Sequence, residues 1–101
     1  MKLTTGEQNF LTKYFPKEEI GTVKKYTVTT MFGDTMLLDS LGYKLYMWII
    51  GIEGILNNPK MFTEKTMNTY KVKSKGGLIQ IFDRGRYLFM KLYPEYAEMV
   101  H

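Results

Sequence analysis

The sequence lacks cysteine and has no hydrophobic run long enough to span a membrane. Without cysteine the chain cannot form disulfides, thiolate metal sites or a cysteine nucleophile. Small secreted domains usually depend on disulfides, so we expect a cytoplasmic protein. The longest apolar stretch, residues 45–56, is interrupted by Glu53 and falls well short of the roughly 20 residues of a spanning helix. The first residues lack the apolar run of a signal peptide. We therefore expect no membrane association.

Groups that carry chemistry are also scarce. The one histidine, His101, is the last residue, and because chain ends fray it is a poor catalytic base or metal ligand. The only adjacent acids, Glu18 and Glu19, are explained by the dipole of a helix that begins there. Glu53 is the one acid in a strongly apolar run. Burial would raise its pKa and could make it a catalytic acid or base, but a position at the rim of the helix or a lysine partner explains its presence there more simply. We expect no enzyme, no metal site and no cofactor.

What remains is the composition of one small globular domain. The 101 residues are 45% hydrophobic, 15% aromatic and 24% charged, which excludes a disordered chain. Methionine and tyrosine are plentiful, with eight of each. Both are adaptable contact residues, and tyrosine is enriched at protein interfaces. The composition therefore favours a binding protein.

Turn-forming residues divide the chain into five stretches of helical length. They are Phe15-Pro16, Gly33-Asp34, Asn57-Asn58-Pro59 and Gly76-Gly77. This spacing predicts an all-α fold, a compact bundle of about five helices. The alternative is an α+β fold with a small β-hairpin around residues 68–83. Residues 16–33 are expected to be helical, although the run of β-branched residues 27–30 is typical of a strand.

The first, fourth and fifth stretches carry helix boundary signals. Thr5 followed by Gln8 fits a capping box. Thr63 is the expected N-cap of a polar, lysine-rich helix over the fourth stretch, and Pro94 ends the fifth helix. The fifth helix has one apolar face with a glycine on it, made by Leu78, Ile81, Phe82, Gly85, Leu88, Phe89 and Leu92.

The third stretch, from an N-cap at Asp34, has the clearest helical period. Its first face is apolar at alternating spacings of three and four, at Leu38, Leu41, Leu45, Trp48, Ile52 and Ile55. Its opposite side is also apolar and consists of Tyr43, Tyr46, Met47 and Ile50. A helix that is apolar all round is buried on both sides. We therefore predict that Trp48 lies in the core and that the second side meets the fifth helix or a second copy of the chain, in a homodimer.

Basic residues are concentrated in residues 60–91, which hold eight Lys or Arg and two acids, or +6 against +4 for the whole chain. An acidic partner or a nucleic acid would be attracted to this region. The candidate contact residues are Lys65, Asn68, Thr69, Lys71, Lys73, Lys75, Arg84, Arg86 and Lys91. With only two arginines, the usual readers of guanine, a solvated face is the simpler interpretation.

Two functions follow from these features. The first is a non-enzymatic regulator or inhibitor that docks on a larger protein or protein–nucleic-acid complex. The second is direct binding of DNA or RNA by the basic face of residues 60–91. A phage or mobile-element accessory protein would have this size and composition.

Overall fold

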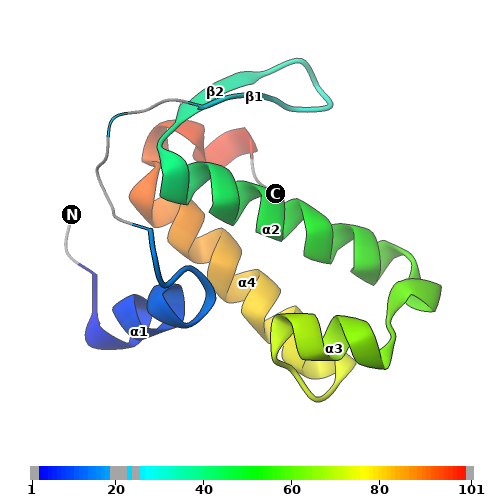
Figure 1. Cartoon of the computed structure of the whole chain (residues 1–101). Coiled ribbons are helices and arrows are strands. Elements are labelled where there is room, and N and C mark those ends of the chain that lie inside the picture. Colours follow the sequence, from blue (N-terminus) through cyan, green and yellow to red (C-terminus); the bar gives the residue numbers. More distant parts are fainter. Residues whose placement is uncertain (1–2, 19–22, 24–25, 100–101) are drawn as a thin grey trace.

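The computed structural model describes residues 3–18, 23 and 26–99, and these are mostly helical with one small antiparallel sheet (Figure 1). In chain order the elements are α1 (Thr5–Tyr14), β1 (Tyr26–Thr29), β2 (Thr35–Leu38), α2 (Ser40–Asn57), the 3-10 helix η1 (Pro59–Met61), α3 (Glu64–Tyr70), α4 (Lys75–Leu92) and the 3-10 helix η2 (Pro94–Met99). The α+β alternative is therefore closer than the five-helix bundle.

The hairpin of β1 and β2 replaces the helix predicted over residues 16–33, of which residues 19–22 and 24–25 lie outside the described residues. The two strands pair antiparallel, with Tyr26 opposite Leu38 and Thr29 opposite Thr35. Gly33 makes the turn possible, since its φ of 86° is a conformation that glycine adopts without strain. The β-branched run before the turn favours a strand. This preference prevails over the helix predicted for residues 16–33.

Asp39, and not Asp34, is the N-cap of α2. Asp34 lies in the hairpin turn, where its carbonyl accepts a hydrogen bond from Thr30 N–H at 2.8 Å. The buried Asp39 carboxylate accepts from Gly42 N–H at 2.7 Å and from the Tyr93 hydroxyl at 2.5 Å. The helix thus begins about five residues later than predicted, and its cap also fixes the end of α4.

The long helices α2 and α4 pack side by side and form the centre of the core (Figure 1). The predicted inner faces are largely confirmed. Leu41, Leu45, Ile52 and Ile55 of α2 and Leu78, Leu88 and Phe89 of α4 are buried. Trp48 is half-buried, and its ring meets Gly85 of α4. The two helices thus approach closely at Gly85, whereas a Cβ at Gly54 of α2 would meet nothing within 4 Å.

The short helices differ from the prediction in their lengths. The capping box of α1 is Thr4 with Glu7, one residue earlier than predicted. The Thr63 cap is confirmed, but α3 ends at Tyr70, because Lys71 takes the left-handed conformation with a φ of 56°. Ser74 then caps α4, so no hairpin forms around residues 68–83. In the described part of the chain, no helix is long and apolar enough to cross a membrane.

Candidate functional site

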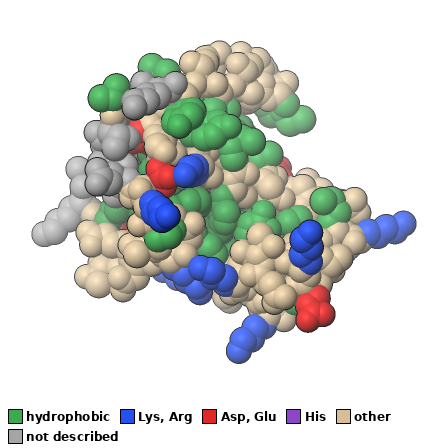
Figure 2. All heavy atoms as spheres, in the orientation of Figure 1, with side chains coloured by type: hydrophobic (Ala, Val, Ile, Leu, Met, Phe, Trp, Pro, Cys, Tyr) green, Lys and Arg blue, Asp and Glu red, His purple; other side chains and the backbone are tan. Residues whose placement is uncertain are grey.

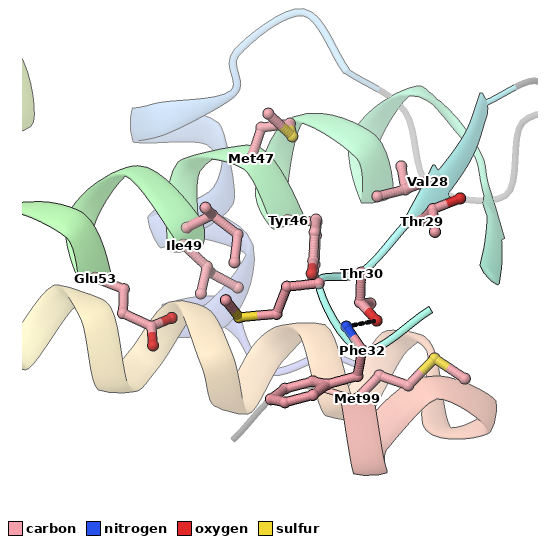
Figure 3. Close-up of a pocket in the computed structure, with 11 residues that line it drawn as sticks. Val28, Thr29, Thr30, Phe32, Tyr46, Met47, Ile49, Glu53 and Met99 are labelled. Carbon is pink, nitrogen blue, oxygen red and sulfur yellow. Dashed lines mark hydrogen bonds between the residues drawn. The ribbon is translucent and has the colours of Figure 1, made fainter. Parts of the chain in front are cut away.

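An apolar groove of about 390 Å³ lies between the hairpin turn and α2 (Figure 3). We call it the hairpin groove. Its lining residues are Val28, Thr29, Thr30, Met31, Phe32, Tyr46, Met47, Ile49, Ile50, Glu53 and Met99. β1 and the turn form one wall, α2 forms the other, and Met99 of η2 contributes at one end. A concave, mostly apolar site with a few polar groups is the usual form of a binding site.

Aromatic contacts hold the base of the hairpin against the helices. The rings of Tyr26 and Tyr43 stack with centroids 4.6 Å apart. The hydroxyl of Tyr96 in η2 accepts a hydrogen bond from Leu37 N–H at 3.0 Å. Met36, on the inward side of β2, is completely buried. The hairpin is therefore anchored through its strands, which leaves its turn to project past α2.

The turn itself is organised by Thr30. The Thr30 hydroxyl oxygen accepts a hydrogen bond from Phe32 N–H at 3.3 Å (Figure 3). It also accepts one from Asp34 N–H at 3.2 Å. Together with Gly33 these bonds fix the path of the backbone between the strands. The side chains of Met31 and Phe32 thus extend from a preformed turn. A partner that binds them would lose little free energy in ordering this backbone.

The most exposed large apolar side chains of the described chain border the hairpin groove. Met31 is 91% exposed and Phe32 is 79% exposed. Across the groove on α2, Met47 and Ile50 are 47% and 43% exposed. Figure 2 shows hydrophobic side chains gathered beneath the hairpin. Contiguous apolar surface of this kind marks interaction sites in soluble domains.

One acid interrupts the apolar lining. Glu53 is half-buried in α2 and has no ion-pair partner among the described residues. Burial raises the pKa of Tyr46, and the negative charge of Glu53 raises it further. Tyr46 is therefore a neutral phenol at physiological pH, and its ring points from α2 toward the hairpin turn (Figure 3).

The structure separates the four residues predicted as a protein interface. Tyr46 is buried against Phe89, with ring centroids 5.8 Å apart, and Tyr43 is half-buried in its stack with Tyr26. Only Met47 and Ile50 remain exposed. Phe89 of α4 covers Tyr46, Tyr26 of the hairpin covers Tyr43, and the hairpin groove borders the exposed Met47 and Ile50.

Sequence reasoning missed Met31 and Phe32, because it placed them at the end of a helix. Their position immediately before Gly33-Asp34 was the available signal, since consecutive apolar residues beside a turn have no helix face to bury them.

The predicted basic contact residues do not form one face. Lys65, Asn68 and Thr69 lie on α3, and Lys71 and Lys73 follow it in the loop. The lysine-rich helix predicted over the fourth stretch is shorter than expected, because α3 has seven residues and its last turn has no basic side chain. The Thr69 hydroxyl donates to the Lys65 carbonyl at 2.9 Å, inside its own helix.

On α4 the remaining basic residues point in different directions. Arg84 and Arg86 are about 200° apart around the helix. Lys91 forms an ion pair with Glu7 of α1 at 2.7 Å, which lowers the pKa of Glu7 and raises that of Lys91. Lys75 is exposed in the first turn. Three of the predicted basic residues contact α1: Lys71 donates to the Lys13 carbonyl, Arg84 lies over the Phe10 ring and Lys91 pairs with Glu7. Figure 2 shows Lys and Arg side chains scattered over the part of the visible face that carries α1 and α3.

Comparison of the chain with protein-family models, curated proteins and solved structures finds no match. Among the described residues, no group of three or more His, Asp or Glu is placed to hold a metal ion. The hairpin groove and the charged surface are therefore the two candidate sites.

Proposed function

We propose that the protein is a non-enzymatic binding protein that regulates or inhibits a larger protein, or a protein–nucleic-acid complex, by docking through the hairpin groove. The observation that carries this proposal is the exposed pair Met31 and Phe32 on a preformed turn, beside an apolar groove. Burying a Phe or Met side chain contributes roughly 1.5–3 kcal/mol. A partner that buries both Met31 and Phe32 would gain a substantial part of the free energy of a typical protein–protein interaction.

The chemistry of the groove defines the partner segment. Apolar walls accept an aliphatic or aromatic side chain, which would act as the central anchor. Covering the groove would also remove water from Glu53, and a buried carboxylate without a partner is costly. The segment therefore carries an apolar anchor with a Lys or Arg placed to meet Glu53. This combination is found on one face of an amphipathic helix.

Ile50→Glu is the discriminating variant, because it places a charge in the groove wall without touching the core. The chain offers a matched control, Ile79→Glu on α4. Ile79 is 41% exposed against 43% for Ile50, and it lines no part of the groove. Both variants should keep a cooperative melt close to that of the wild type.

The binding test begins with capture of partners from the source cells, with and without nuclease, using the wild type and both variants. A partner retained by Ile79→Glu and lost by Ile50→Glu is then purified and titrated by calorimetry. We expect Ile50→Glu to weaken its binding at least about tenfold, or about 1.4 kcal/mol. Glu53→Gln should weaken it less and reduce its salt dependence.

Other results would contradict the proposal. Equal binding by Ile50→Glu and the wild type would exclude the groove. If light scattering shows a wild-type dimer that Ile50→Glu converts to a monomer, the occupant of the groove is a second copy of the chain. Partners lost on nuclease treatment in every sample would favour the alternative function, direct DNA or RNA binding.

A further inference from the structure

A second cavity, of about 340 Å³, lies between α1 and α4 and has a different chemistry. Its lining includes Asn9 and Lys13 of α1 and Arg84 of α4, and it contains no Asp or Glu. Lys71, at the end of α3, reaches the same place, since its Nζ donates to the Lys13 carbonyl at 3.1 Å. We call Lys13, Lys71 and Arg84 the cation cluster. It shares no residue with the hairpin groove.

Aromatic rings hold the three charges in place. The Nζ atoms of Lys13 and Lys71 lie 5.4 and 5.8 Å from the centroid of the Tyr14 ring. The guanidinium carbon of Arg84 lies 5.1 Å from the centroid of the Phe10 ring. Cation–π contacts of this length are favourable and restrict the side chains without neutralising them. These contacts thus favour particular positions of the three cations before any ligand arrives.

The charges of the cation cluster are not balanced within the described chain. The described ion pairs join Lys44 to Glu18 and Lys91 to Glu7, and none includes a member of the cluster. Lys13 and Arg84 line a cavity whose lining has no acid, and Lys71 lies beside Lys13, so these cations attract an anion. A phosphate group fits this arrangement better than a carboxylate, because its oxygens point in several directions and can accept from separate cations.

The surroundings indicate a polymer of phosphates rather than a single one. Lys73 follows Lys71 in the loop, Lys75 begins α4, and both are exposed. Proteins that hold single strands offer free aromatic faces on which bases stack. Here Lys13 and Lys71 lie over Tyr14, and the buried Phe10 lies beneath Arg84. The site therefore suits the backbone of a duplex and no base.

We infer that the cation cluster binds the phosphate backbone of duplex nucleic acid without reading its sequence. This inference does not depend on the hairpin groove. It adds a contact by which a regulator of a protein–nucleic-acid complex would engage both components. It also replaces the basic face predicted over residues 60–91 by a smaller site that includes Lys13 of α1.

The test measures fluorescence anisotropy of a labelled mixed-sequence DNA duplex between about 50 and 200 mM salt. The site variant is Lys13→Gln with Lys71→Gln. The matched control is Lys17→Gln with Lys60→Gln, which removes two exposed lysines elsewhere and changes the net charge equally. Each lost phosphate contact should reduce the log–log salt slope by about 0.9, so the site variant should lose about 1.8 and the control almost nothing. Thermal melts would test that both variants are folded. Ile50→Glu should bind the duplex like the wild type.

Four results would overturn the inference. The first is no binding of the duplex by the wild type at the lowest salt. The second is an equal loss in the site and control variants, which would mean attraction by net charge alone. The third is tighter binding of a single-stranded oligothymidylate of equal charge. The fourth is binding of polyglutamate with the same salt slope, which would assign the cluster to acidic proteins.

Discussion

Replacing Gly85 with alanine should destabilise the domain, whereas the same replacement at Gly54 should stabilise it. Both glycines lie inside long helices, Gly54 in α2 and Gly85 in α4. A Cβ built at Gly85 would lie 2.4 Å from Cζ3 of Trp48, whereas at Gly54 it would meet no atom within 4 Å. The two variants therefore share one backbone effect and differ only in packing.

The shared effect is helix propensity, which favours alanine by about 1 kcal/mol. At Gly54 nothing opposes it. At Gly85 the Trp48 ring would have to move, and it is held by Phe10 and Tyr14, whose ring centroids lie 5.9 and 5.2 Å from its own. Overpacking of this kind costs about 1–3 kcal/mol. Gly85→Ala should therefore be destabilising by up to about 2 kcal/mol, and the difference between the two variants should be about 1–3 kcal/mol.

Urea unfolding of both variants measures these free energies, provided that their slopes agree with that of the wild type. Trp48→Leu supplies the control, because it removes the ring atoms that approach Gly85. In that background Gly85→Ala should become stabilising by about 1 kcal/mol. If Gly85→Ala stabilises the wild type as much as Gly54→Ala does, the Trp48 ring is not packed on α4 and the reasoning fails.

Three further predictions concern the caps, the turn and the charges. Asp39→Ala should lower the free energy of unfolding by about 2–4 kcal/mol, because it removes the α2 cap and leaves the buried Tyr93 hydroxyl without this acceptor. If equilibrium unfolding shows a smaller loss for Asp39→Ala than for Tyr93→Phe, the prediction is wrong. Gly33→Ala should lower the free energy of unfolding by about 1–2 kcal/mol and Gly33→Asn by less, because asparagine tolerates a positive φ better than alanine does; equal thermal melts of the two variants would refute this. The Glu7–Lys91 ion pair lowers the pKa of Glu7, so its stabilisation is present above the unfolded pKa and is lost as pH falls. The stability difference between the wild type and Glu7→Gln should therefore shrink as pH falls below the usual glutamate pKa of about 4.3.

The core of α2 and α4 was predictable because helical periodicity is a local property of the sequence. Helical spacing alone places Leu45 with Ile52, and Leu78 with Phe89, on one face of their helices. All four side chains are buried. The Thr63 cap and the stop at Pro94 were predictable for the same reason. Local rules place such residues on the correct side without a three-dimensional model.

The hairpin was not predictable in this way, because two local preferences conflict there. The helical spacing of apolar residues before Gly33 competed with the strand preference of the β-branched run at residues 27–30. The strands also make tertiary contacts, because Tyr26 stacks on Tyr43 and Met36 is completely buried. The shift of the α2 cap from Asp34 to Asp39 is a consequence, since β2 occupies the residues between them.

The two candidate sites depend on contacts between distant segments. The cation cluster needs Lys13 of α1 beside the end of α3, a separation of 58 residues between Lys13 and Lys71. The hairpin groove needs the turn at Phe32 placed over Ile50 of α2. The charge excess of residues 60–91 identified Lys71 and Arg84 as candidates, but neither their grouping nor Lys13 follows from it.

The hairpin turn combines a hydrogen-bonded backbone with exposed apolar side chains, and these two properties together argue for a role in binding. An isolated two-stranded hairpin is marginally stable in water, yet this one is anchored by Tyr96, by Tyr26 and by Met36. The anchored strands then display Phe32, whose burial elsewhere would contribute roughly 1.5–3 kcal/mol to folding. A turn shaped only for stability would carry polar residues at this position, because the backbone bonds of Thr30 and Gly33 do not need an aromatic side chain. The exposed aromatic ring is best explained by a partner surface that covers it, as the proposed function requires.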